Sequence, residues 1–374
     1  MQTAFNKPGI AAIASVALVA AVPSFAQQTT AASAESASNA PFASIDAGLQ
    51  QDVFVASGPT VVPDAQLGGL AFSADGELWW LECVRAGTHA HRFSARIAVT
   101  RHQTTLRVET GTSAIPGGCA LVSHPDGTFY TVMDAGKFGI AQLDRTGAPM
   151  RRFGPPANAL GLTVDPLTQH LVYVGRECLA AGDHDGCAVV DVDPVTEQTR
   201  TFARIDTARI GLLGAIAFDP DAKYLFVALR GRENGIAILD RAGAIVQRFV
   251  TPGRPEGIAF SAALPRFVVL TTGDGTLARL DFSDDEYREP PSMRTIGRGG
   301  FGGGHAQVGQ DGCLYVSQES TRYRDGVVTP ESSIVRVCGG FAPPPAGAVP
   351  PHGIPTALTA AGSSSRSVLL PARP

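Results

Sequence analysis

The sequence predicts an all-β protein built from repeated four-stranded antiparallel units, because three observations agree. Short apolar runs bounded by Gly, Pro, Asp and Asn are typical of strands joined by tight turns, and the stretch from Gly214 to Val250 contains four such runs. Four strands in about 40 residues is the size of one propeller blade, and similar stretches recur along the chain. The chain also holds 42 glycines and 27 prolines, which suits many tight turns.

Each predicted unit opens with an apolar strand that begins at a glycine, or at His305 in the last unit. The strands of the fourth unit are GAIAF, YLFVAL, GIAILD and AIVQRFV, with DPDAK and DRAG as turns and RGREN as a polar loop. The six units open at Gly69, Gly118, Gly161, Gly214, Gly257 and His305.

The last unit lacks an outer strand, since GGFAPPPAG follows Cys338 at once. A lone strand, Gln50 to Gly58, precedes the first unit and can supply the missing piece. Pairing the two closes the ring and removes an exposed edge. The sequence therefore predicts a six-bladed β-propeller of four-stranded antiparallel blades over residues 46–340, with the ring closed by an N-terminal strand.

The N-terminus predicts export. Lys7 precedes the apolar run Ile10 to Val22, and Pro23 to Ala26 forms a small-residue cleavage site, so residues 1–26 are the predicted signal peptide. The run is too short for a transmembrane anchor, which is the alternative. We expect a Ser/Ala/Thr-rich disordered spacer at 27–45 and a Pro/Ala-rich tail at 341–374. The expected location is periplasmic or secreted, with no membrane span after cleavage.

Six cysteines in an exported chain favour disulfides, with free buried thiols as the alternative. Cys178 and Cys187 lie at the two ends of one polar loop. Cys313 opens a second strand, and Cys338 ends the antiparallel third strand beside it. We predict disulfides between the members of each of these two pairs, and Cys83–Cys119 follows by elimination. The sequence contains no CxxC or HxxxH spacing, so it does not indicate a zinc site.

The repeated phrase G-[IL]-A-F-x-x-D-G-x-L-[YW]-[VW] resembles the NHL and gluconolactonase-like six-bladed propellers. The stretch DGELWWLE is also similar to blades of the streptogramin-lyase type. The resemblance covers most of residues 50–340. It consists of core and turn residues, so it predicts the fold more specifically than the function.

In such blades the first strand lines a central channel. The loops entering that strand, and those between the second and third strands, share one face that normally carries the site. Here that face is predicted to hold charged stretches of mixed sign: Glu82 to Arg92, Asp134 to Lys137, Arg176 to Gly186, Arg230 to Asn234, Gly273 to Gly275 and Gln318 to Glu331. The candidate binding residues are Arg176, Arg230, Arg232, Glu82 and Glu319.

Arg176 and Arg230 occupy matching positions after the second strands of two units. Two arginines on one face can clamp a carboxylate or a phosphate. The alternative is that they pair with Glu177 and Glu233 beside them, in a solvated rim.

The gluconolactonase resemblance implies a divalent cation held by carboxylate and amide side chains at the starts of the inner strands. The matching positions in this chain are Gly68, Gly117, Leu160, Gly214, Glu256 and Gly304. Only Glu256 carries an oxygen ligand, whereas calcium takes six to eight. We therefore predict no metal ligand and no certain cofactor, and keep Mg²⁺ or Ca²⁺ as the alternative for an enzyme.

Glu256 and His305 are the candidate catalytic pair, because they open the first strands of consecutive blades. A histidine with a pKa near neutrality can transfer protons, and streptogramin lyases look similar in using His and Glu around a magnesium ion. If both side chains enter the channel, the carboxylate should raise the imidazole pKa. If strand alternation turns His305 into the interface between blades, the pair is structural.

The leading functional prediction is an exported propeller that binds a small molecule, glycan or protein partner on its charged top face. The alternative is a lyase or hydrolase that acts at the channel mouth through the Glu256–His305 pair. The net charge of −4 and the lack of a Lys/Arg run argue against nucleic acid as a partner.

Overall fold

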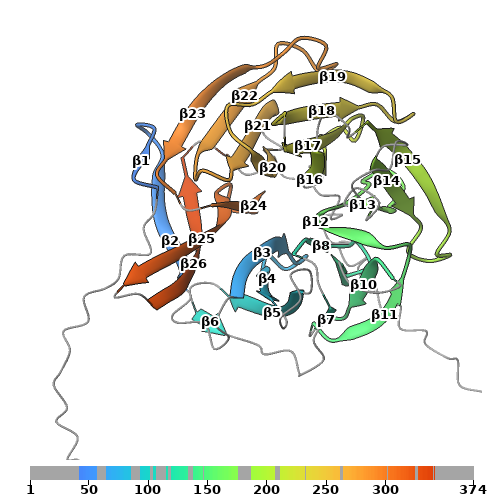
Figure 1. Ribbon diagram of the computed structural model, residues 1–374, viewed down its shortest axis with the longest axis horizontal. Helices are drawn as coiled ribbons and strands as arrows, with labels where there is room; N and C mark the ends of the chain where they lie inside the picture. The colour runs from blue at the N-terminus through green and yellow to red at the C-terminus, as the bar shows by residue number, and fades with distance from the viewer. Residues whose placement is uncertain are drawn as a thin grey trace, which may run out of the picture. The chain divides into compact units, whose positions relative to one another are not determined.

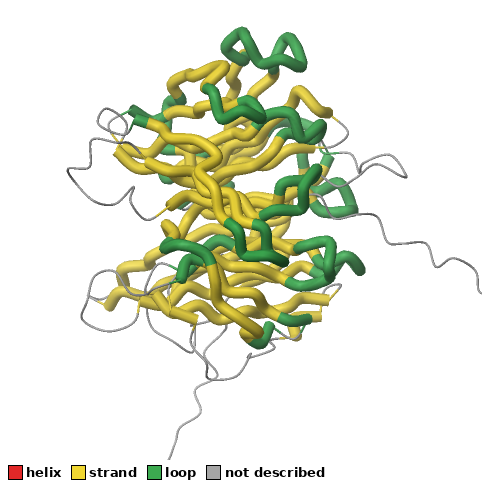
Figure 2. Tube along the Cα trace, turned by 90° about the vertical axis from the view of Figure 1, so that its right-hand side faces the viewer, coloured by secondary structure: helices red, strands yellow, loops and turns green. Residues whose placement is uncertain are grey.

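The computed structural model describes residues 42–56, 65–85, 93–101, 104–106, 115–116, 119–133, 138–145, 147–175, 187–206, 211–231, 233–261, 264–300, 302–324, 327–339 and 341. The regular structure of these residues is entirely β, as Figure 2 shows. No helix in this part of the chain is long and apolar enough to cross a membrane. The predicted signal peptide, most of the spacer and nearly all of the tail lie outside the described residues.

The described strands form six antiparallel sheets, numbered here in chain order. Sheet one contains β3 (Ala65–Phe72), β4 (Leu78–Arg85), β5 (Phe93–Arg101) and β6 (Thr104–Leu106), and β7 (Ile115–Pro116) also pairs with β5. Sheet two contains β8 (Leu121–Ser123), β9 (Phe129–Val132), β10 (Ile140–Leu143) and β11 (Pro149–Phe153). Sheet three contains β12 (Ala157–Val164), β13 (Leu171–Gly175), β14 (Cys187–Val192) and β15 (Thr199–Ile205).

The remaining three sheets follow the same order of strands. Sheet four contains β16 (Gly211–Phe218), β17 (Leu225–Gly231), β18 (Gly235–Leu239) and β19 (Ile245–Val250). Sheet five contains β20 (Pro255–Ser261), β21 (Leu264–Thr272), β22 (Leu277–Asp281) and β23 (Ser292–Arg298), with β1 (Ser44–Ile45) on its outer edge. Sheet six contains β24 (Gly303–Val308), β25 (Leu314–Arg324) and β26 (Val327–Cys338), with β2 (Gln50–Ala56) on its outer edge.

The sheets are blades in a propeller arrangement, as Figure 1 shows. The first main strand of each sheet lies innermost and contacts the inner strands of its neighbours. In this way β3 lies against β8 and β24, β12 lies against β8 and β16, and β20 lies against β16 and β24. The inner strands therefore share one centre, which is where the candidate site must be sought.

Both faces of a blade are buried, which explains why its middle strands are largely apolar, as in Leu225 to Leu229 of β17. In β17, Val227 and Leu229 pack into a cluster shared with sheet three. The residues that alternate with them, Phe226 and Ala228, point the other way and pack into a cluster shared with sheet five. The run YLFVAL thus supplies two cores at once. Leu67 and Trp80 of sheet one similarly share a cluster with sheet six.

The N-terminal segment joins the outer edges of two sheets. Within β2, Gln51 pairs with Val337 of β26, as the sequence predicts. Strand β1 is an addition, because Ser44 and Ile45 pair with Arg298 and Gly297 of β23. Strand pairing therefore begins two residues before the predicted boundary at residue 46. Phe42 is 3% exposed and packs in the core between sheets five and six.

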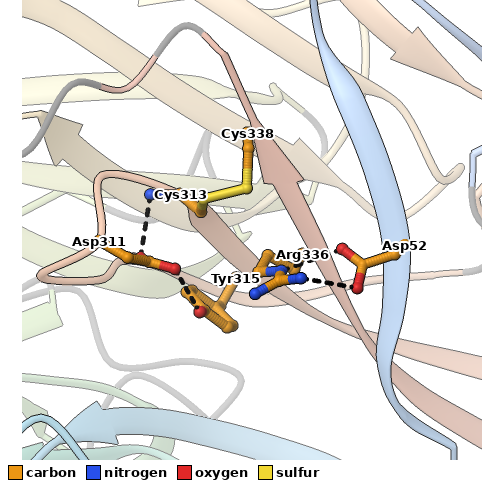
Figure 3. The surroundings of a disulfide bond; sticks show 6 residues. All are labelled: Asp52, Asp311, Cys313, Tyr315, Arg336 and Cys338. Carbon is orange, nitrogen blue, oxygen red and sulfur yellow. Dashed lines mark hydrogen bonds and ion pairs between the residues drawn. A yellow bond between two sulfur atoms is a disulfide. The ribbon is translucent and has the colours of Figure 1, made fainter. Parts of the chain in front are cut away.

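A predicted disulfide, Cys313–Cys338, is confirmed and fastens this outer region (Figure 3). It joins the start of β25 to the end of β26, with the two Cα atoms 4.4 Å apart. Beside it, Arg336 of β26 pairs with Asp52 of β2, and both hydrogen bonds measure 3.0 Å. The disulfide and the ion pair hold β26 between its two neighbours.

Two further cysteines, Cys119 and Cys187, are disulfide-bonded. Cys178 and the side chain of Cys83 lie outside the described parts of the chain. The pairings Cys178–Cys187 and Cys83–Cys119 therefore stay predictions.

One predicted loop is wrong. The stretch Gln318 to Glu331 was expected to be a loop, but β25 continues to Arg324 and β26 starts at Val327. The two strands pair along this whole length, from Gln318–Ser333 to Arg324–Val327. The physical reason is the β-branched and aromatic content of Thr321, Tyr323 and Val327 to Thr329, which favours extended strands.

Candidate functional site

The inner strands β3, β12, β16, β20 and β24 each have a β-bulge near the end where the strand enters its sheet, whereas the described part of β8 has none. In β20 the register passes from Pro255–Thr272 to Gly257–Thr271, which leaves Glu256 as the extra residue. In β24 it passes from Gly303–Gln318 to Ala306–Val316, so that Gly304 and His305 together oppose Ser317. Bulges interrupt the ladder and redirect side chains, and they are frequent beside functional sites. Both predicted catalytic residues therefore lie in bulges of neighbouring inner strands.

The hydroxyl group of Ser317 in β25 hydrogen-bonds the backbone N–H and C=O of His305, at the point where the bulge interrupts the strand ladder. The His305 N–H donates to Ser317 Oγ at 2.9 Å, and the Ser317 hydroxyl donates back to the His305 carbonyl at 3.3 Å. The adjacent Gly304 carbonyl accepts a hydrogen bond from the Thr271 hydroxyl of sheet five at 2.7 Å. The two hydroxyl groups fix the main chain on both sides of His305.

His305 is the largest residue at its level of the inner strands. In the repeated phrase of the inner strands, His305 precedes Ala306, and its counterparts, directly before the aligned residues Leu70, Leu162, Ile216 and Ile258, are Gly69, Gly161, Ala215 and Gly257. Because these residues are small, the imidazole has room that equivalent side chains would otherwise fill.

The imidazole lines a cavity of about 50 Å³ at the centre of the inner strands. Each of the six inner strands contributes to its wall, including Leu70, Leu121, Thr163, Ile216 and Ile258. This volume has room for roughly three water molecules. Of the two positions that the sequence left open for His305, the structure has the residue in the wall of this central cavity.

Glu256 is bound by two arginines. Its Oε1 lies 2.6 Å from Nη2 of Arg230, which comes from the end of β17 in sheet four. The same oxygen lies 2.6 Å from Nη2 of Arg254, which directly precedes β20. The side chains of Arg230 and Glu256 are 13% and 18% exposed, so water screens this pair only partly. The described contacts of Glu256 are thus to arginines and not to His305.

The electrostatics of His305 differ from the prediction. Burial, and next the positive charge of Arg230, lower the pKa of His305 to about 4. The expectation that Glu256 raises this pKa is wrong, because the two arginines neutralise the carboxylate and one of them acts directly on the imidazole. At pH 7 the imidazole is neutral, so it can accept a proton or donate one hydrogen bond.

The other predicted binding residues are only partly placed. Arg230 lies at the site, while Arg176 and Arg232 lie outside the described residues. Glu82 and Glu319 belong to strands β4 and β25, but their side chains are not among those described. The sequence reasoning missed Arg254. The available signal was its position beside Pro255 and Glu256, in a loop that enters an inner strand.

The described residues at this mouth do not fit a divalent cation. Within the described part of the chain, no three His, Cys, Asp or Glu side chains are grouped closely enough to hold a metal ion. The one carboxylate of the mouth already has two guanidinium partners. We therefore derive no chemical step through a metal here.

Comparison with known proteins identifies the fold. No family model matches the chain. It is similar to the structure of a gluconolactonase from Xanthomonas campestris, with 14% identity, a TM-score of 0.54, and coverage of 79% of this chain and 91% of that one. It is also similar to a putative oxidoreductase (glucose dehydrogenase) from Thermus thermophilus, with 18% identity, a TM-score of 0.54, and coverage of 78% and 100%.

A third similar structure is a protein of unknown function from Dyadobacter fermentans, with 10% identity, a TM-score of 0.53, and coverage of 78% of this chain and 100% of that one. At these identities the likeness establishes a β-propeller fold and not an activity.

Proposed function

We propose that this protein is an exported β-propeller that binds a ligand at the mouth of its central cavity. The ligand is a small molecule, a glycan or an exposed group of a protein partner. The observation that carries the proposal is the contact of Arg230 with Glu256 across two blades, near enough to the cavity-lining His305 for the charge of Arg230 to act on the imidazole. Charged groups that converge from different elements on a cavity are typical of binding sites.

The size of the cavity supports binding at the mouth over enclosure. Pockets that surround a drug-sized ligand measure about 300–1,000 Å³, whereas this cavity measures about 50 Å³. A ligand larger than a few water molecules must therefore remain outside this cavity, and the ion pairs of Glu256 with Arg230 and Arg254 are the charged groups that we propose it contacts.

Export rests on the N-terminal sequence, residues 1–26. The Cys313–Cys338 disulfide is compatible with it, because disulfides persist in oxidising compartments.

We also infer a single closed ring of six blades. The clusters between sheets support this inference, since one joins sheet six to sheet one just as others join consecutive sheets. The pairing of β2 with β26 would then be the closure.

The second candidate function is that of a lyase or hydrolase at the same mouth. A neutral His305 can act as a general base at pH 7, which favours this candidate. A pKa of about 4 makes it a weak base, however, and the described residues offer no ligand set for a metal that would activate a water molecule. We therefore rank binding above catalysis.

The test is a thermal-shift screen of the purified mature protein with sugars, organic acids and glycans, followed by turnover assays on lactones and esters with and without Mg²⁺ or Ca²⁺. Hits should be lost in Glu256→Gln and His305→Ala. The fold should tolerate His305→Ala, because other inner strands carry Gly or Ala at this level. Metal-dependent turnover would place catalysis first. Hits that both variants retain would move the site elsewhere.

A further inference from the structure

The wall of the central cavity changes in character along the inner strands. His305 lies at the level where the strands enter their sheets. One residue further along, the sixth strand supplies Ala306 and the other five supply large apolar side chains. Those five are Leu70, Leu121, Leu162, Ile216 and Ile258. Beyond this apolar ring the wall includes Thr163, Gln307 and Ser123. The cavity therefore has polar groups at both ends and an apolar ring between them.

Ser123 is the polar residue furthest from His305 along the strands. The N–H groups of His124 and Gly309 each donate to the carbonyl group four residues later, in the turn that follows the inner strand of sheets two and six. Ser123 is therefore level with Val308, three residues beyond His305. A rise of about 3.3 Å per residue separates Ser123 from His305 by roughly 10 Å along the strands.

Neither of these two side chains is satisfied by the described parts of the protein. Ser123 is 6% exposed, and its buried hydroxyl group has no hydrogen-bond partner among the described residues. The described hydrogen bonds between His305 and Ser317 involve the backbone of His305 and not its ring. Buried polar groups are nearly always hydrogen-bonded, so a bound molecule is expected to supply the partners.

The cavity limits both the size and the charge of such a molecule. Its volume of about 50 Å³ has room for roughly three water molecules. The described wall residues include no Asp, Glu, Lys or Arg, and the imidazole is neutral at pH 7. A charged molecule would lose its hydration here without gaining a counter-ion. The positive charge of Arg230, which acts on the imidazole, disfavours a cation further.

We propose that the central cavity is a second binding site, for a small neutral molecule with a hydrogen-bonding group at each end. One end pairs with the ring of His305, the other pairs with the hydroxyl group of Ser123, and the body packs against the apolar ring. Two hydrogen bonds of about 2.8 Å leave roughly 4 Å of the separation for the molecule, which suits a two-carbon diol. The inference goes beyond the ligand of the mouth, because it concerns molecules that fit inside the cavity.

The test uses three probes of nearly equal size at pH 7: ethylene glycol, 1-propanol and protonated ethanolamine. NMR of the His305 imidazole in histidine-labelled protein reports binding, with His305→Ala to assign the signal. Ethylene glycol should shift the signal saturably and bind at least about tenfold more tightly than 1-propanol, which leaves one polar end of the cavity without a partner. Ethanolamine should not bind, because it carries a charge.

Two variants test the two layers of the wall. Ala306→Leu completes the apolar ring, so it should fill the cavity and abolish binding. Because added volume can disturb the packing, Ser123→Ala is the second variant. It should remove the preference for ethylene glycol over 1-propanol, since the end that needed a partner is then apolar. The matched control is Ser261→Ala. Ser261 in the inner strand β20 is also buried with an unpartnered hydroxyl group among the described residues, but it lies outside the wall.

Three results would overturn the inference. If no probe shifts the His305 signal saturably, the cavity holds water at most. If Ser123→Ala keeps the preference for ethylene glycol, or Ser261→Ala loses it, Ser123 is not the second partner. If ethanolamine binds as tightly as ethylene glycol, the cavity accepts a charge. None of these results bears on the proposed function, because the ligand of the mouth is too large to enter the cavity.

Discussion

Gly214 leaves the space that Arg230 occupies. A Cβ atom at Gly214 would lie 2.5 Å from Cδ of Arg230 and 3.1 Å from its Cγ. Gly214 lies in the bulge of β16, where the register passes from Leu213–Leu229 to Ile216–Val227. A position that lacks any ligand atom is therefore essential for placing the guanidinium group that contacts Glu256.

Gly214→Ala should displace Arg230 from Glu256. Because the clash is with the middle of the arginine stem, we expect a loss of about 1–3 kcal/mol in the free energy of unfolding. The pKa of His305 should rise from about 4, because the charge of Arg230 is one of its two causes. NMR titration measures this pKa. Gly297→Ala is the control, with its nearest atom, Leu277 Cδ1, at 3.3 Å. An unchanged His305 pKa in Gly214→Ala would contradict the view that Gly214 leaves the space for Arg230 and that the charge of Arg230 lowers this pKa.

Arg241→Gln should destabilise the contact between sheets three and four. Asp165 is fully buried, and its Oδ2 lies 2.5 Å from Nη2 of Arg241. Burial alone would raise the pKa of Asp165, but the hydrogen bonds from Arg241, Leu167 and Thr168 together outweigh it and lower the pKa. Loss of the arginine leaves a buried charge without its cation, which costs on the order of 3 kcal/mol.

The stabilisation by the Asp165–Arg241 pair should depend on pH. A lowered folded-state pKa contributes stability above the unfolded pKa, and the contribution disappears as the pH falls through the folded value. Urea unfolding should therefore show a larger difference between wild type and Arg241→Gln at pH 7 than at pH 3. The double variant Asp165→Asn/Arg241→Gln should recover much of the loss. Equal destabilisation at both pH values would refute the electrostatic account.

The stability contributed by Asp219 should change with pH in the opposite direction to that contributed by Asp165. Burial raises its pKa from 3.8 to about 6, even though its Oδ1 accepts the Tyr224 N–H at 2.8 Å. A raised folded-state pKa gives stability that is complete below the unfolded pKa and is lost as the pH rises through about 6. Asp219→Asn removes the titration, so the melting temperature of the variant should rise relative to that of the wild type as the pH increases from 4 to 7. A constant difference across this range would rule out the titration.

Removal of the Cys313–Cys338 disulfide should destabilise sheet six. The bond closes a loop with a sequence separation of 25 residues, for which the chain-entropy account gives about 3 kcal/mol. The double variant Cys313→Ser/Cys338→Ser should lower the free energy of unfolding by this amount in guanidinium titrations. Substitution is preferable to a reductant, because Cys119 and Cys187 are also disulfide-bonded. No measurable loss would mean that the ladder between β25 and β26 suffices.

Peptide mapping without reduction should recover Cys187 linked to Cys178 and Cys119 linked to Cys83. The loop between β13 and β14 begins after Gly175 and ends at Cys187, so the first link needs only a short closure. Cys119 precedes β8, which lies against β3 of the sheet that contains Cys83. Recovery of Cys187 with any other cysteine would exclude the predicted pairing.

The fold was readable from the sequence because both faces of each blade are buried. Runs such as YLFVAL, separated by Asp-Pro and Gly turns, mark the strands directly. The long hairpin of β25 and β26 was missed because charged residues such as Arg322 and Arg324 alternate with its strand formers. The dipeptide Asp325–Gly326, a strong hairpin signal, was available.

The sequence predicted two residues of the candidate site but not the contacts that they make. Counting from the apolar phrase of each blade placed Glu256 and His305 at the mouth, because the repeat fixes their level. Their partners could not be inferred, since Arg230 and Arg254 come from a strand end and a loop whose side-chain directions depend on the bulges and on Gly214 and Gly273. A search for ligand atoms alone passes over glycines, whose contribution here is space.

The pairing of β2 with β26 sets an order on the formation of the molecule. Strand β2 is synthesised long before its partner β26, because Asp52 and Arg336, which pair across the two strands, are 284 residues apart in the sequence. Until then β2 has an unsatisfied edge and must be kept from pairing with other strands. Contacts this distant in sequence slow folding. A premature stop before β26 would therefore leave β2, about 280 residues earlier in the sequence, without its partner strand.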